Sequence, residues 1–438
     1  MENKTDIKQY FIKQFDEFEK SLNGEKTTEF HQLRKSAISN FQELSFPTQK
    51  DEEWKYTNIS SLLKHNFLPA KSKEIVSSEI INQFLFDRLE HSLLVFVNGI
   101  YSPELSRITD LPKGVQVGSI AEAIKNNNPL IKKHLGNYSK DENYFFTTLS
   151  SAFIKDGAFV YVPDGKVVED PLHIILYTKS TDSKIFTQPR NLFIAGQNSQ
   201  VSIIEHYLSD EENIYLTNAV TEIFADENAI VDHIKLQEES KKAFHIARMD
   251  VDQERNSNFS SHLISCGAEI SRNDFNTRFN AEGSESMLNG LFMIDGEQLF
   301  DAHTMIDHTK PHCNSHEHYK GILQDKAKGV FNGKVMVRQD AQKTNAFQQN
   351  NTILLSDDAV MNTKPQLEIF ADDVKCSHGA TIGKLNDEAK FYLKSRGIGE
   401  DAATALLIHA FASDVITSIK IPALRDYLEE IITKRFNK

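Results

Sequence analysis

Hydrophobic residues near the start of the chain recur every three or four positions, which is the period of one helix face. Phe11, Phe15, Phe18 and Leu22 follow this pattern. The pattern predicts a mostly helical region from about residue 5 to 65, with a second helix over 28–44. Pro47 should end that second helix, because a residue that precedes proline avoids the helical conformation.

From about residue 143 to 383 the pattern changes to short apolar runs separated by turns. Ala158-Phe-Val-Tyr-Val162 before Pro-Asp-Gly and Leu192-Phe-Ile-Ala195 before Gly-Gln-Asn-Ser are typical of strands followed by turns. An antiparallel sandwich or barrel and a β-solenoid both fit such a region. Turns near Gln197, Glu227 and Asn256 recur at about 30 residues, although later turns break this period. About 240 residues of short strands are many for one sandwich, and this length favours the solenoid, because a solenoid grows coil by coil without a size limit.

After Gly383 the helical period returns. We expect a short helix that Asp387 caps, a longer helix from Asp401, and a final helix that starts at Pro422. The longer helix carries an apolar stripe, whose members are Ala405, Ile408, Phe411, Ala412, Val415, Ile416 and Ile419. The pattern leaves open whether this stripe packs on the rest of the chain or on another protein.

These changes divide the chain into three regions. Residues 1–140 form an N-terminal helical region with short strands, one of which is Leu93-Leu-Val-Phe-Val97. Residues 141–385 form the β-rich core, and residues 386–438 form a C-terminal helical region.

Charge and composition narrow the functional classes. The 438 residues include 49 basic and 62 acidic side chains, a formal net charge of −13, which argues against nucleic acid as a partner. No apolar signal core follows the polar first residues, and no run approaches the roughly 18 apolar residues of a membrane span. We therefore expect a cytoplasmic protein without membrane contact.

Cysteine is scarce. Cys266, Cys313 and Cys376 are too few for a disulfide framework and indicate a reducing compartment. By themselves they also cannot supply the four thiolates that an iron–sulfur cluster commonly takes.

A group of histidines surrounds Cys313 and suggests a metal site. Its members are His303, His308, His312, His316 and His318. The spacing weakens this interpretation, because the adjacent His312 and Cys313 would point to opposite faces of a strand. The paired two-ligand units of a structural zinc site are also missing. Histidines that line a polar face of the β-region are the simpler interpretation.

Cys376 and His378 form a second candidate. Being two residues apart, they share one face of an extended strand and could bind one metal ion. Lys375 would favour the thiolate electrostatically. Two ligands do not complete a site, so another chain would have to supply the rest. A buried structural cysteine is the alternative.

The same residues carry a family resemblance. The run from Lys364 to Gly383, with Lys-Cys-Ser-His-Gly-Ala at its centre, strongly resembles the signature of the SufB/SufD family of the SUF iron–sulfur cluster assembly system. The Cys-Ser-His order is similar to the SufD type, since the SufB type has Glu between Cys and His. Further similar segments occur in the family's order between about residue 46 and 430: Phe46–Thr57, Phe96–Leu105, Gly321–Leu323, Val330–Gly333 and Phe391–Ile398.

The resemblance implies a mainly β fold, a right-handed parallel β-helix core flanked by N-terminal and C-terminal helical regions. It implies a non-catalytic scaffold subunit that works with SufB and the ATPase SufC. Cys376 and His378 would lie at the SufB interface, where a transient iron ion or nascent iron–sulfur cluster is held. This chain alone would hold no stable cofactor. The stripe from Ala405 to Ile419 would dock on SufC, and the β-helix edge also allows the isolated chain to form a homodimer.

Two other classes remain as alternatives: a β-helix enzyme that acts on polysaccharides, and a stand-alone metal-binding protein that uses the histidine group. Such polysaccharide enzymes are usually secreted and display carboxylates along a groove, which the polar N-terminus and the Cys–His motif do not favour. The sequence also lacks a P-loop, a nucleophile elbow and a dinucleotide-binding glycine motif.

Overall fold

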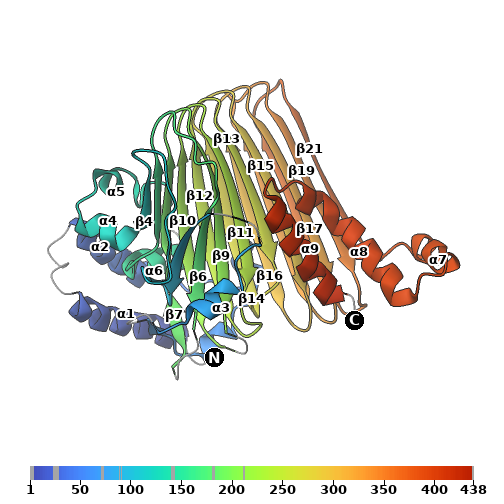
Figure 1. The fold of residues 1–438 in the computed structure, drawn as a ribbon, viewed down its shortest axis with the longest axis horizontal. Coiled ribbons are helices and arrows are strands. Elements are labelled where there is room, and N and C mark those ends of the chain that lie inside the picture. The colour runs from blue at the N-terminus through green and yellow to red at the C-terminus, as the bar shows by residue number, and fades with distance from the viewer. Residues whose placement is uncertain are drawn as a thin grey trace.

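The computed structural model describes residues 4–22, 29–70, 74–87, 89, 91–139, 144–179, 183–210 and 213–436. The chain forms a β-solenoid with helices at its N-terminal end and along one side towards its C-terminal end (Figure 1). The helices are α1 (Lys4–Ser21), α2 (Glu29–Glu43), α3 (Ser78–Asn82), α4 (Ile120–Lys125), α5 (Pro129–His134), α6 (Phe145–Ala152), α7 (Asp387–Ser395), α8 (Glu400–Thr417) and α9 (Pro422–Phe436).

Two sheets form the walls of the solenoid. In spatial order, sheet 1 contains β20 (Val360–Ile369), β18 (Lys328–Val337), β16 (Leu299–His308), β14 (Ile270–Phe279), β12 (Phe244–Gln253), β10 (Leu216–Ala225), β8 (Arg190–Ala195), β5 (Ala158–Val162) and β4 (Gln116–Ser119). Beside this row, β7 (Ile185–Thr187) pairs with β10, and β1 (Leu68–Pro69) pairs with β7. Sheet 2 contains β21 (Lys375–Gly383), β19 (Asn345–Leu354), β17 (Asn314–Leu323), β15 (Glu285–Ile294), β13 (Asn258–Ser265), β11 (Ile230–Glu238), β9 (Gln200–Ser209), β6 (Leu172–Thr178), β2 (Ser92–Val97) and β3 (Ile100–Tyr101).

Strands alternate between the sheets, and neighbours in the solenoid are parallel, so the predicted β-solenoid is confirmed and the sandwich is excluded. From β10 to β21 the spacing of register partners varies from 26 residues (Ile246 to Arg272) to 32 residues (Lys334 to Gln366). Loops of unequal length therefore explain why the sequence period breaks down. Alternate side chains point inwards and fill the space between the sheets with one apolar core.

Stacked asparagines at one corner explain the turn recurrence that the sequence shows. Asn198, Asn228 and Asn256 adopt positive φ angles of 54°, 56° and 54°. The side-chain amide of Asn228 donates to Asn198 at 3.1 Å, and that of Asn256 donates to Asn228 at 3.2 Å. Asparagine tolerates this left-handed conformation better than most residues. The ladder ends at Gly283, where a Cβ atom would lie 2.3 Å from Asn256 Oδ1.

Helices α1, α2 and α6 pack around phenylalanines at the N-terminal end. The predicted apolar face of α1 is buried, and Phe41 contacts both Phe11 and Phe145 with ring centroids 6.3 and 4.6 Å apart. The expected start of α2 at Thr28 lies outside the described residues. The prediction that the helical region continues to residue 65 is wrong, because α2 ends at Glu43 and only short 3₁₀ turns follow it, at Glu52–Trp54 and Leu62–Lys64.

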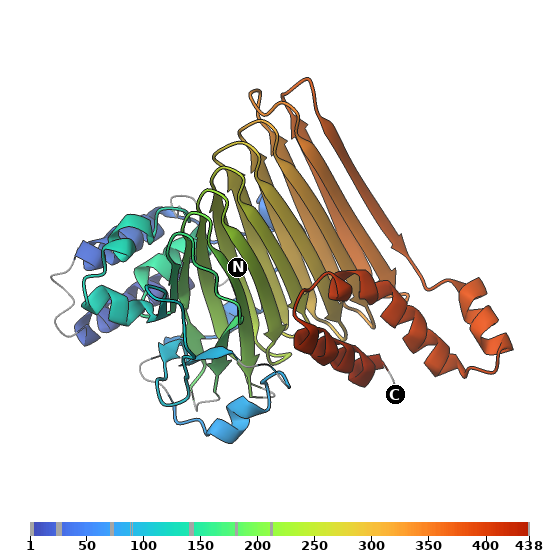
Figure 2. The ribbon, with the colours of Figure 1, turned by 45° about the horizontal axis from the view of Figure 1, so that its top comes forward.

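The predicted strand at Leu93 is β2, which belongs to sheet 2 beside β6. The three C-terminal helices are also confirmed, although Asn386 rather than Asp387 caps α7, by accepting from the backbone N–H of Ala389. Helices α8 and α9 lie on the outer face of sheet 2, whereas α7 lies apart from both sheets beyond the last strands (Figure 2). None of the described helices is both long and apolar enough to cross a membrane.

Candidate functional site

The solenoid ends in an open coil formed by β20 and β21. Within the described residues, β20 pairs only with β18, and β21 pairs only with β19. Most side chains of β20 are half-buried and most of β21 are exposed, unlike the alternating pattern of β18 and β19. This end therefore presents strand edges from both sheets, and such edges readily pair with another chain.

Cys376 and His378 lie on the outermost strand of this open coil. The register aligns Cys376 with Ala346 and His378 with Gln348, both of which are buried, so the two candidate ligands share the inner face of β21. Cys376 is half-buried beside Val335 and Ala346, while His378 is exposed. The structure thus brings the predicted pair together at the solenoid's end.

The predicted activation of Cys376 by Lys375 is not found. Partial burial raises the pKa of the Cys376 thiol, although a backbone hydrogen bond from Ala346 works in the opposite direction. The thiol is therefore mostly protonated in the free chain. A bound metal ion would have to displace that proton.

The histidine group around Cys313 does not converge. His308 points into the solenoid and bonds to Ser315 at 2.9 Å, whereas His303 lies on the outer face of sheet 1 beside Asp301. His312 occupies a turn with a φ of 60°, and the remaining two histidines lie on sheet 2. Among the described residues, no three His, Cys, Asp or Glu side chains are grouped as metal ligands. The structure therefore contradicts the idea of a stand-alone metal centre here.

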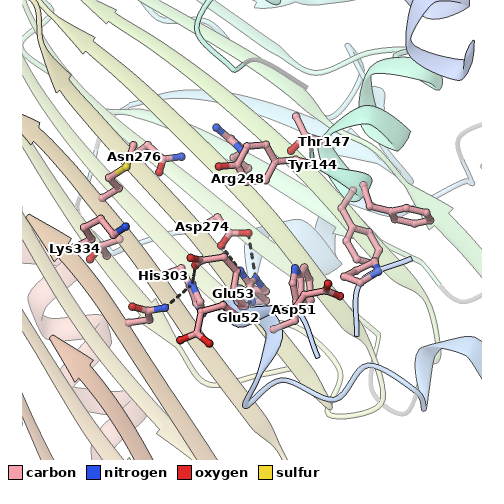
Figure 3. A pocket seen from close by; sticks show the side chains of 18 of the residues that line it. Asp51, Glu52, Glu53, Tyr144, Thr147, Arg248, Asp274, Asn276, His303 and Lys334 are labelled. Carbon is pink, nitrogen blue, oxygen red and sulfur yellow. Dashed lines mark hydrogen bonds and ion pairs between the residues drawn. The ribbon is translucent and has the colours of Figure 1, made fainter. Parts of the chain in front are cut away.

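A polar cleft of about 530 Å³ lies on the outer face of sheet 1, where the segment after α2 crosses the strands (Figure 3). The guanidinium carbon of Arg272 lies 3.8 Å from the centre of the Trp54 ring, and the rings of Trp54 and Phe146 have centroids 5.7 Å apart, so Trp54 anchors this segment to the sheet. Arg248 lies under Tyr144 in the same way, at 3.9 Å. The sequence pattern does not reveal this cleft, because its residues come from segments that lie far apart in the chain.

Ion pairs hold the crossing segment to the sheet. Arg272 pairs with Asp301 at 3.0 Å and donates to the backbone carbonyl of Glu53 at 2.6 Å. His303 contacts the carboxylates of Asp301 and Glu53 at 3.0 and 3.1 Å. Burial alone would lower the pKa of His303, but the Asp301 carboxylate reverses this effect and raises it to about 9. The cleft contains as many acidic as basic side chains, and some of them pair with one another. The contacts of His303 and Arg272 with Glu53 attach the segment after α2 to the outer face of sheet 1.

Comparison with known proteins assigns the family. A family model described as "SUF system FeS cluster assembly, SufBD core domain" matches residues 177–411, and the model "SufBD protein N-terminal region" matches residues 5–174. The chain belongs to the SufB/SufD family. The family resemblance that the Cys–His segment suggested is thereby confirmed, and it extends over nearly the whole chain.

Proteins that are similar to this chain show which type of the family it represents. The chain is 35% identical to the iron–sulfur cluster assembly SufBD family protein slr0076 of Synechocystis, covering 92% of this chain and 90% of that protein. It is 32% identical to the iron–sulfur cluster assembly protein SufD of Escherichia coli, covering 89% of each chain. It is also 30% identical to the chloroplastic protein ABCI7 of Arabidopsis thaliana, over 90% of this chain and 83% of that one. This chain is a SufD-type subunit of the SufB/SufD family.

The apolar stripe of α8 lies inside this SufD-type chain. Six of its members are at most 3% exposed; these are Ala405, Ile408, Ala412, Val415, Ile416 and Ile419. Most of them pack on outer side chains of sheet 2 such as Ile234 and Met293, and on α9. Phe411 is half-buried and lies under the ammonium group of Lys320 at 4.9 Å. The prediction of a partner surface is therefore wrong for the six buried residues, because the rest of the chain already covers them, whereas Phe411 keeps exposed surface.

Proposed function

We propose that this chain is the non-catalytic SufD scaffold of a cytoplasmic complex with SufB and the ATPase SufC, in which iron–sulfur clusters are assembled. The observation that supports this most directly is the position of Cys376 and His378 on the uncovered terminal coil. A ligand pair at an open strand edge fits a site that two chains share.

SufB fits the open end for a structural reason. A second member of the family would bring strands of the same spacing, which can pair with the edges of β20 and β21. Pairing would bury exposed apolar residues on these strands, among them Ile369 and Ile382. It would also place the partner's side chains close to Cys376 and His378.

Iron and sulfide are the substrates of this site, and the cluster leaves it as the product. Thiolate and imidazole are both ligands for iron, but this chain supplies only one of each at the open coil. We therefore assign the remaining ligands to SufB. On this view the chain holds no stable cofactor by itself.

The SufC contact belongs to the exposed faces of α7 and α8, since the buried stripe cannot reach a partner. Phe391, Tyr392 and Leu406 are 73%, 57% and 49% exposed. They form apolar surface on the helices that extend beyond the solenoid (Figure 1). ATP-driven movement of SufC would pull on these helices and open the shared site, provided that the open complex binds the ATP-bound form more tightly.

Cluster reconstitution tests the role of His378. We expect His378→Ala to reduce the cluster formed on the purified SufB–SufC–SufD complex at least tenfold, measured by absorbance and by bound iron and sulfide. His316→Ala is the matched control, because His316 is also exposed but lies on the outer face of β17. A full cluster yield with His378→Ala in an intact complex would exclude His378 as a ligand.

A further inference from the structure

Polar side chains form a column inside the solenoid directly below His378. The register stacks Glu317, Gln348 and His378 on successive strands of sheet 2, namely β17, β19 and β21. Glu317 and Gln348 are only 2% and 1% exposed, although the neighbouring core is apolar. Burying two polar groups is costly unless they have hydrogen-bond partners, so their placement calls for a reason.

Glu317 determines how the Gln348 amide is turned. Gln348 Nε2 donates a hydrogen bond of 2.6 Å to Glu317 Oε2. An ionised carboxylate only accepts, so it selects the nitrogen end of the amide. Burial raises the pKa of Glu317 to about 7. Above that pH the carboxylate is mostly ionised, so the Gln348 amide has to turn its nitrogen towards it. Gln348 Oε1 then remains as a buried acceptor without a hydrogen-bond partner among the described residues.

Space for the amide is provided by a glycine on the opposite sheet. A Cβ atom on Gly333 would lie 2.3 Å from Gln348 Nε2, so any other residue would displace the side chain. Thr304, the register partner of Gly333 on β16, lies at the same level, and its hydrogen bond to Glu317 opposes the effect of burial on the pKa of that carboxyl. The absence of a side chain at Gly333 therefore leaves room for the Gln348 amide. The oxygen of this amide, Oε1, has no hydrogen-bond partner among the described residues.

We propose that Gln348 is a positioning residue for His378. Its Oε1 accepts the hydrogen bond of one ring N–H of His378 while the other ring nitrogen binds iron, and Glu317 keeps the amide in that orientation. Metal-bound histidines almost always donate their second ring N–H to such an acceptor, which fixes the tautomer and the ring. This inference rests on the proposed role of His378 as a ligand.

Cobalt(II) binding at pH 8 tests the proposal in the intact SufB–SufC–SufD complex. The visible absorption of Co²⁺ reports its ligands, and a titration gives its dissociation constant. We expect Gln348→Leu and Glu317→Leu to weaken Co²⁺ binding by about 10-fold or more. Glu317→Gln should bind Co²⁺ more tightly than Glu317→Leu but less tightly than the unmodified complex, because its amide oxygen can still accept from Gln348 while its amide nitrogen no longer excludes the reversed orientation. Thr352→Val is the control, since Thr352 is another buried inner residue of β19 that lies below Ile382.

The outcomes separate the two proposals. Normal Co²⁺ affinity with Gln348→Leu, together with lost affinity with His378→Ala, would overturn the positioning role and leave the ligand role intact. Normal affinity with His378→Ala would overturn both. Equal weakening by Thr352→Val would mean that the coil had merely loosened, which also overturns the positioning role. If Gln348→Leu fails to assemble, the comparison of Glu317→Leu with Glu317→Gln decides, because equal affinities of those two variants would contradict the proposal.

Discussion

At the scale of single residues, charge matters most where a side chain is buried beside an opposite charge. His303 holds the segment after α2 against sheet 1 and has a pKa of about 9, against about 6.5 for free histidine. A raised pKa stabilises the fold fully below pH 6.5, and this contribution disappears as the pH rises through 9. The contribution is at most about 3–4 kcal/mol, because one pKa unit corresponds to about 1.4 kcal/mol.

We therefore expect the free energy of unfolding to decrease between pH 6.5 and 9 in urea titrations. His303→Gln should remove most of this decrease, whereas the exposed control His316→Gln should keep it. An unchanged pH dependence in His303→Gln would show that other groups dominate.

At the scale of secondary-structure elements, the neighbouring helices α7 and α8 have different roles. Ile416 is 2% exposed and packs on sheet 2, whereas Phe391 and Tyr392 on the neighbouring α7 face outwards. Ile416→Asp buries an unpaired charge, so it should lower the free energy of unfolding by about 3–5 kcal/mol or detach α8.

Phe391→Asp combined with Tyr392→Asp should leave the melting temperature unchanged but abolish co-purification of SufC. Stoichiometric SufC with that double variant would place the ATPase contact elsewhere.

At the scale of the whole molecule, the two ends of the solenoid differ. The N-terminal end is closed by β4, which runs antiparallel to β5, and by the helices beside it, while β20 and β21 remain open. Open strand edges associate, so we expect the isolated chain to form homodimers at micromolar concentration, measured by light scattering. Gly379→Lys should yield monomers, since its Cβ would meet nothing within 4 Å and its charge would lie at the edge. Gly399→Lys, with equal space but away from the edge, is the control. Dimers that persist in Gly379→Lys would contradict edge pairing.

Local patterns in the sequence determined much of this protein. The periods of three to four and of two residues depend on neighbouring positions, so α1, α2, α8, α9 and most core strands were predictable. The asparagine turns revealed the coil repeat because each coil reuses one corner. Cys376 and His378 were found from their spacing and signature, since two residues on one strand necessarily share a face.

Tertiary structure decided what covers each surface. A helical stripe has the same pattern whether its own sheet or a partner covers it, so only the fold showed that Ile408 and Ile416 are internal. Coil stacking joins residues about 30 positions apart, and it therefore separated the histidines around Cys313 and aligned Glu317 and Gln348 under His378. The sequence by itself determined the elements and the placement of Cys376 and His378 on one face of a strand, because both depend on local spacing. The stacking of coils decided which side chains meet, because that depends on loop lengths that no local pattern records.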